Sequence, residues 1–123
     1  MAKQITGVLV TTEGEAKQVT IEDSLEGYYE ALGCDIIDLT VRRIGKKEYD
    51  IVCDDEGLLK PDPVVTAITQ RYQPALVGNL FICSNDGKGH WKSLTAKQIE
   101  EILMNTVMVF SNGKIREVVQ IWA

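Results

Sequence analysis

The basic side chains of this 123-residue chain concentrate in one short run, which is the first candidate for an anion-binding site. Arg42, Arg43, Lys46 and Lys47 stand close together in a half of the chain that is otherwise rich in acids. Guanidinium groups hold phosphate or carboxylate oxygens through paired hydrogen bonds, and ammonium groups add point charges. We therefore expect Arg42, Arg43 and Lys46 to contribute to an anion-binding site. The alternative is that these cations flank an exposed hairpin and protect an edge strand from pairing with another sheet.

A second candidate lies in the loop-forming stretch 84–90, where Lys88 and His90 alternate with two glycines. Glycines expose backbone amides that can cradle a phosphate, and the two side chains add cationic or donor groups. We therefore add Lys88 and His90 to the candidate anion-binding residues. The spacing matches no known phosphate-binding loop, so a plain connection between a strand and the next helix is the alternative.

Three carboxylates follow one another at Asp54, Asp55 and Glu56, just before Gly57. Clustered carboxylate oxygens are the ligands that Mg²⁺ and Ca²⁺ prefer. The run lacks the alternating spacing and closing glutamate of a calcium-binding EF-hand loop, which favours a solvated hairpin turn. We therefore expect no metal site and no cofactor, and keep a small metal-dependent enzyme built on this turn as an alternative.

Few residues of the chain are suited to catalysis. His90 is the only histidine, which excludes a mechanism or a metal site that needs two histidines. The sequence contains no nucleophile elbow, phosphate-binding Walker loop or zinc-protease motif. Cys53 and Cys83 lie in apolar, strand-like runs, where a free thiol behaves as a small hydrophobic group. We therefore expect a protein that is not an enzyme and has no catalytic residue.

The elements that position these residues follow from the apolar pattern. β-Branched and alternating stretches predict strands at 5–11, 16–21, 35–43, 49–53, 75–83, 107–110 and 115–122. Helical spacing predicts a helix at 24–33, a second at 63–72 between prolines, and a third that opens at Thr95. Asp23 or Ser24 can cap the first helix and Gly33 can end it, while Thr95 and Gln98 form a capping box. The order predicts one α+β domain over 1–123, a mostly antiparallel sheet covered by about three short helices.

The last two predicted strands form a hairpin over 106–122 around the Asn-Gly pair at 112–113. Apolar residues occupy both faces of this hairpin, and Trp122 stands near its end. An aromatic side chain in that position often packs on a partner surface. We therefore expect the chain to form a homo-oligomer through the C-terminal hairpin.

The charge of the chain limits its partners. The formal net charge is −5, with 14 acidic and 7 basic residues in 1–62 against 4 acidic and 6 basic residues in 63–123. General nucleic-acid binding needs a basic surface, so it is not expected. The sequence also contains no signal peptide and no apolar run of the roughly 20 residues that span a bilayer. We expect a cytoplasmic protein with no membrane contact.

Four local motifs resemble a family of short proteins described as domain of unknown function 3846. The motifs are an acidic-Glu-Gly turn, a short proline-bearing segment before a helix, a Val-Gly strand start and a Ser-Leu-Thr helix start. In this chain they are Asp55-Glu56-Gly57, residues 61–65, Val77-Gly78-Asn79-Leu80-Phe81-Ile82 and Ser93-Leu94-Thr95-Ala96-Lys97-Gln98-Ile99. The resemblance covers about 5–105, leaves the hairpin 106–122 outside, and carries over no catalytic residue. It implies an accessory protein of a phage or mobile element.

These observations favour a non-enzymatic protein that acts by binding, with counter-defence as the expected role. It would either sequester a nucleotide-type immune signal through the cationic residues above or inhibit a host defence protein. In the second version, the acidic surface of the first half could imitate nucleic acid. The alternatives are the metal-dependent enzyme and a structural or regulatory partner protein with no ligand.

Overall fold

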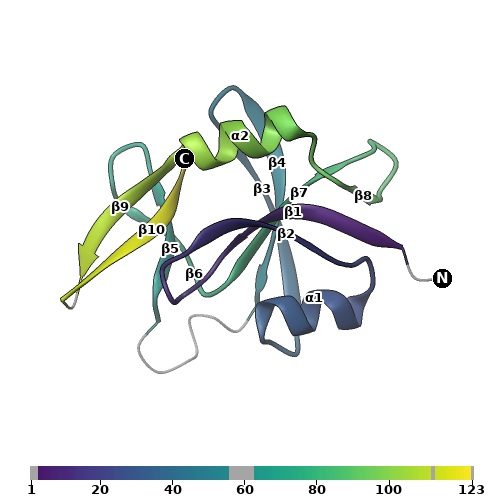
Figure 1. Ribbon diagram of the computed structural model, residues 1–123, viewed down its shortest axis with the longest axis horizontal. Coiled ribbons are helices and arrows are strands. Elements are labelled where there is room, and N and C mark those ends of the chain that lie inside the picture. Colours follow the sequence, from purple (N-terminus) through teal and green to yellow (C-terminus); the bar gives the residue numbers. More distant parts are fainter. Residues whose placement is uncertain (1–2, 56–62, 112, 123) are drawn as a thin grey trace.

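The computed structural model describes residues 3–55, 63–111 and 113–122 (Figure 1). The described ranges hold two helices, α1 (Leu25–Leu32) and α2 (Ala96–Met104). The strands are β1 (Gln4–Val10), β2 (Ala16–Glu22), β3 (Ile37–Ile44), β4 (Lys47–Asp54), β5 (Val65–Thr69), β6 (Pro74–Val77), β7 (Leu80–Asn85), β8 (Trp91–Lys92), β9 (Thr106–Ser111) and β10 (Lys114–Ile121). Together they form an α+β fold, as expected.

The first sheet runs in the order β2-β1-β7-β4-β3, with β8 added beside β7, and every pairing in it is antiparallel. Its centre is the most buried part of the chain, because β4 and β7 are covered on both faces. Tyr49, Ile51 and Ile82 point to one face, and Val52 and Phe81 point to the other. All five side chains are almost completely buried.

The two helices lie on opposite faces of this sheet (Figure 1). On the α1 face, Tyr28 and Leu32 pack with Val52, Phe81 and other residues of one core cluster. On the α2 face, a larger cluster includes Ile99 and Ile102 of the helix together with Ala67, Val119 and Ile121 of the second sheet. The first sheet thus separates two apolar cores.

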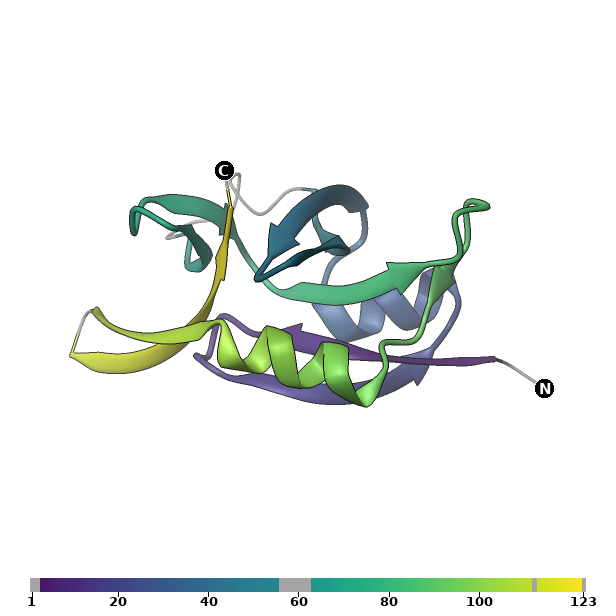
Figure 2. The same ribbon diagram turned by 90° about the horizontal axis from the view of Figure 1, so that it is seen from above.

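The second sheet has the order β6-β5-β10-β9 and lies at one end of the molecule (Figure 1). β5 and β10 are parallel, while β5–β6 and β9–β10 are antiparallel. β9 and β10 form the expected C-terminal hairpin, which projects beyond the rest of the fold (Figure 2). Asn112 of its turn lies outside the described residues.

The local signals at the helix ends are confirmed. Ser24 caps α1 by accepting a hydrogen bond from the Gly27 amide at 3.0 Å, and Gly33 ends that helix with φ 64°. At α2, the Thr95 hydroxyl accepts from the Gln98 amide at 3.2 Å, and the Gln98 side chain accepts from the Thr95 amide at 2.8 Å. This reciprocal capping box fixes where α2 begins.

The expected helix over 63–72 is wrong, because this segment contains β5 and the turn that follows it. The segment is rich in β-branched residues, and Thr66, Ala67 and Ile68 are all buried, as in a strand covered on both faces. The Thr66 hydroxyl donates to the carbonyl of Gly78 at 2.6 Å, which satisfies the one buried side-chain polar group of the strand.

The expected continuous strand over 75–83 is also divided. Gly78 has φ 82°, a left-handed conformation that interrupts the extended chain and sends β6 and β7 into different sheets. The Gly78 amide donates to the Val64 carbonyl at 2.9 Å, which holds the bend against β5. Where one sheet with about three helices was expected, the described residues form two sheets with two helices. Within the described residues, no helix combines the length and apolar character needed to cross a membrane.

Candidate anion-binding groove

The turn between β3 and β4 places the basic run of the sequence against helix α2. Gly45 occupies the turn with φ 64°, where an L side chain is strained. A Cβ atom at Gly45 would also stand 3.0 Å from Nδ2 of Asn105 and 3.1 Å from the side chain of Glu101. The turn is therefore packed closely against the last turns of α2.

Two adjoining cavities lie between this turn and α2, and we call them together the α2 groove. The larger, of about 450 Å³, is lined by Gly45, Lys46, Lys97, Glu100, Glu101, Met104 and Asn105. The smaller, of about 220 Å³, is lined by Lys47, Tyr49, Thr95, Lys97, Gln98 and Glu101. Lys97 and Glu101 line both cavities, so the two lie next to each other.

Three lysines give the α2 groove its cationic character. Lys46 and Lys47 come from the β3–β4 turn, and Lys97 comes from the first turn of α2. All three side chains are exposed, and the structure gives none of them an ion pair with a described carboxylate. Their ammonium groups are available to an anion that enters the groove.

Glu101 carries the main opposing charge, and its side chain is fixed by a neighbour. The Tyr49 hydroxyl donates to Oε1 of Glu101 at 3.0 Å. Burial, followed by this hydrogen bond to a carboxylate, raises the pKa of Tyr49 to about 12. Tyr49 therefore remains a donor at neutral pH, and its hydrogen bond holds the Glu101 carboxylate in place.

Arg42 and Arg43 were expected at the same site, and the structure assigns them other contacts. The Arg43 guanidinium lies 5.0 Å from the centre of the Trp122 ring, and its Nε donates to the Gly45 carbonyl at 3.0 Å. The Trp122 amide donates to the Arg43 carbonyl at 2.9 Å. Arg43 thus links β10 to the β3–β4 turn. Arg42 pairs with Tyr49 in the strand register, and its buried Nε has no hydrogen-bond partner among the residues that the structure describes.

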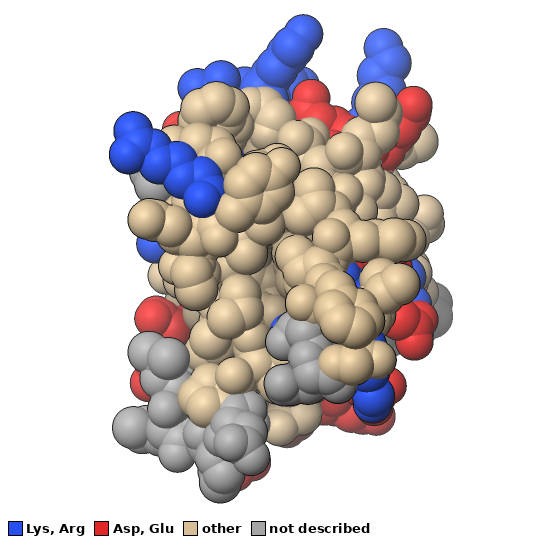
Figure 3. Space-filling view, turned by 90° about the vertical axis from the view of Figure 1, so that its left-hand side faces the viewer, with Lys and Arg blue, Asp and Glu red and all other residues tan. Residues whose placement is uncertain are grey.

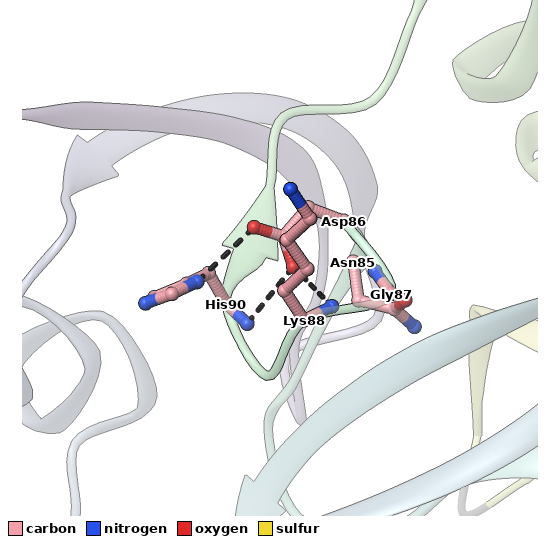
Figure 4. A network of polar contacts seen from close by, with 5 residues as sticks. All are labelled: Asn85, Asp86, Gly87, Lys88 and His90. Carbon is pink, nitrogen blue, oxygen red and sulfur yellow. Dashed lines mark hydrogen bonds and ion pairs between the residues drawn. The ribbon is translucent and has the colours of Figure 1, made fainter.

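Lys88 and His90 lie in the loop between β7 and β8, away from the α2 groove (Figure 1). The Asp86 carboxylate organises this loop (Figure 4). Its Oδ1 accepts from the amides of Lys88 and His90 at 2.7 and 3.2 Å, and its Oδ2 contacts the His90 ring at 3.1 Å. The hydrogen bond from the Lys88 amide is the main cause that lowers the pKa of Asp86. Two of the loop amides therefore already donate to the protein's own carboxylate, and the Gly87 amide donates to Oδ1 of Asn85 at 2.9 Å.

The acidic turn lies at the other end of β4 from the lysines. Asp54 is buried and Asp55 is exposed, while Glu56 and Gly57 fall outside the described residues. Among the residues that the structure describes, no three His, Cys, Asp or Glu side chains are placed to hold a metal ion. Burial raises the pKa of Cys53 to about 11 and that of Cys83 to about 12, so both remain protonated thiols at neutral pH. The metal-dependent enzyme stays an alternative.

The structure thus divides the five expected residues, and only Lys46 lines the α2 groove. The sequence reasoning missed Lys97, which reaches the groove from an element far along the chain. The capping box at Thr95 places Lys97 in the first turn of a helix, but no local signal tells which turn packs beside it.

A family model described as Domain of unknown function (DUF3846) matches residues 5–108. This range begins within β1 and ends within β9, so it includes both sides of the α2 groove. No curated protein and no solved structure matches the chain.

Proposed function

We propose that this chain, which belongs to the DUF3846 family, acts by binding an anionic ligand of the nucleotide class without converting it. The observation that carries this proposal is the convergence of Lys46, Lys47 and Lys97 on one groove. These lysines come from two elements that pack together only in the folded protein. Their charge opposes the net charge of −5 of the whole chain.

The remaining groups of the groove favour a nucleotide over a bare phosphate. Met104 is 76% exposed beside Lys46 and Lys97, and it offers an apolar surface to a base. Glu100 and the fixed Glu101 can accept hydrogen bonds from sugar hydroxyls or a base amino group. The larger cavity, of about 450 Å³, has the size of a small-molecule site. The same carboxylates oppose the continuous backbone charge of a long nucleic acid.

In this proposal the protein is an accessory protein of a phage or mobile element and works in the cytoplasm of the host. There it sequesters a nucleotide signal of a defence system. Sequestration requires binding without turnover, which suits a groove lined by lysines, carboxylates and a methionine. Inhibition of a host defence protein is the other form of the counter-defence proposal, and it would use a protein surface instead of the groove.

The test is a calorimetric titration with a cyclic dinucleotide, ADP-ribose, AMP and inorganic phosphate. We expect at least one nucleotide to bind, and the K46E/K97E double variant to weaken that binding by about tenfold or more, or about 1.4 kcal/mol. The matched control is K3E/K17E, which changes the net charge equally at exposed positions outside the groove. Raising the salt concentration should weaken binding to the wild type more than to K46E/K97E.

Two results would contradict the proposal. One is the absence of heat with every ligand up to millimolar concentration. The other is an equal loss of affinity in K46E/K97E and in K3E/K17E, which would show an effect of net charge only.

A third variant, K88E/H90A, tests the β7–β8 loop. We expect it to bind the nucleotide like the wild type, because Asp86 already holds that loop.

A further inference from the structure

The C-terminal hairpin carries the most exposed apolar side chains of its sheet. Met108 on β9 is 72% exposed, Phe110 on β9 is 75% exposed, and Ile115 on β10 is 67% exposed. Phe110 and Ile115 are directly paired in the β9–β10 register, so they share one face, and Met108 lies two residues along on that same face. We call these three side chains the hairpin face. Figure 3 looks at this end of the molecule and shows charged side chains mainly at its margins.

The hairpin also ends the second sheet with an unprotected edge. β9 is the last strand in the order β6-β5-β10-β9, and no other described strand pairs with its outer side. Its sequence, Thr106 to Ser111, contains no charged residue and no proline. Natural proteins protect edge strands with charges, prolines or bulges, because free amides and carbonyls template pairing with another strand. β9 lacks these protections and is open to strand addition.

The uncharged edge strand allows a second copy of this chain to be the occupant. Two molecules that each carry a net charge of −5 repel one another unless their contact avoids like charges. The charged residues of β10 are Lys114, Arg116 and Glu117, which pair with Ser111, Val109 and Met108 of β9. When two β9 strands pair, equivalent charges on the two β10 strands stand at least about 14 Å apart, three spacings of about 4.8 Å. Salt at 0.1 M screens charges beyond about 10 Å, so the pairing is not opposed.

We propose that two copies of the chain associate through antiparallel pairing of their β9 strands around a two-fold axis at Val109. This goes beyond the proposed function and does not depend on it. Directly paired residues in an antiparallel sheet share a face. A two-fold axis normal to the sheet also keeps each residue on the same face in both copies, so the axis must pass between one residue and its own equivalent. An axis at Val109 sets Met108 opposite Phe110 of the second copy, twice, which adds sulfur–aromatic contacts. An axis at Met108 would instead set Phe110 opposite Thr106.

The association is tested by sedimentation equilibrium of the wild type, M108K, F110K and the control L25K. Leu25 is 60% exposed on α1, so L25K introduces the same charge on an exposed apolar position away from β9. We expect a wild-type dimer in the micromolar range, the same dimer for L25K, and an affinity weaker by at least about tenfold for M108K and F110K. The far-ultraviolet spectrum of each variant confirms that it is folded. A monomeric wild type, or a dimer that resists both hairpin substitutions, would overturn the proposal.

The register is tested by oxidation of V109C and V107C, each made as a single substitution. In the proposed pairing, the thiol introduced by V109C faces its equivalent across the axis at a Cβ separation of about 5 Å, which a small shift closes into a disulfide. Position 107 would lie about 14 Å from its equivalent. We expect a covalent dimer for V109C only. Equal crosslinking of both variants would rule out the register, and the wild type reports any crosslinking by its own three cysteines.

Discussion

Gly27 explains how helix α1 can lie directly on the end of strand β2. The residue is buried in the first turn of the helix, and a Cβ atom there would stand 2.1 Å from the carbonyl oxygen of Glu22. That separation is far inside van der Waals contact, and both of the nearest atoms belong to the backbone of Glu22. Glycine costs the helix about 1 kcal/mol relative to alanine. It is nevertheless required here, because the backbone of α1 passes so close to the backbone of Glu22.

The substitution Gly27→Ala should therefore destabilise the protein, although the same change stabilises an ordinary helix interior. We expect a loss of about 1–3 kcal/mol in the free energy of unfolding, because the methyl group forces α1 away from β2. Urea denaturation of the variant measures this loss. The control A31G, in the same helix, should cost only the propensity difference of about 1 kcal/mol. A gain in stability for G27A would show that α1 does not rest on Glu22.

At the same scale, the sequence identified the chemistry of some site residues but not their neighbours. Lys46 was predicted from the basic run, and it lines the α2 groove. Lys97 was not predicted, because its place in the groove depends on how α2 packs on the β3–β4 turn. Arg43 was expected to meet a ligand, but its guanidinium lies over Trp122, a contact made only when β10 reaches β3. Side-chain type is local information, whereas the set of side chains around a site is not.

The element scale shows the same division between local and distant causes. The caps of α1 and α2 were predicted, because a cap joins residues three apart in the chain. The segment 63–72 was predicted as a helix because Val64, Val65, Ile68 and Tyr72 fit helical spacing. Its β-branched residues fit a strand equally well, and the parallel pairing of Ala67 with Val119 of β10 decides the outcome. That partner lies far away in the sequence, so no local pattern reveals it.

The turn after β5 contains a residue in a strained backbone conformation, and a substitution can relieve that strain. Tyr72 has φ 61°, a left-handed conformation that costs an L residue about 1–2 kcal/mol, and its side chain is 68% exposed. We expect Tyr72→Asn to stabilise the protein by up to about 1 kcal/mol, since asparagine tolerates this conformation. The midpoint of urea unfolding measures the gain. Gln73→Asn in the same turn is the control and should give no such gain. A lower midpoint for Y72N would indicate that the Tyr72 ring contributes a contact worth more than the strain.

At the scale of the whole molecule, both apolar cores contain tyrosine hydroxyls and cysteine thiols whose pKa values are raised by burial. On the α1 face, burial raises the pKa of Tyr28 well above its ordinary value. The hydrogen bond that the Tyr28 hydroxyl donates to Oδ1 of Asp23 at 2.6 Å raises it further. Burial also raises the pKa of Cys83 on that face to about 12. On the opposite face, burial raises the pKa of Tyr49 to about 12 and that of Cys53 to about 11. The first sheet thus carries raised pKa values on both of its faces.

These shifts predict that the protein loses stability as the pH rises above about 9. In the unfolded chain the thiols ionise at 9.0 and the phenols at 10.0, whereas in the folded protein they keep their protons to about 11 or beyond. Between these values the unfolded state binds fewer protons than the folded state, so a rise in pH favours unfolding. We expect a lower urea midpoint at about pH 10.5 than at about pH 8, with no comparable loss between about pH 7 and about pH 8. The variant Y49F removes one of these groups, so its midpoint should be lower than that of the wild type at about pH 8 and fall less steeply with pH. Equal midpoints at both pH values would show that these protons are not held by the fold.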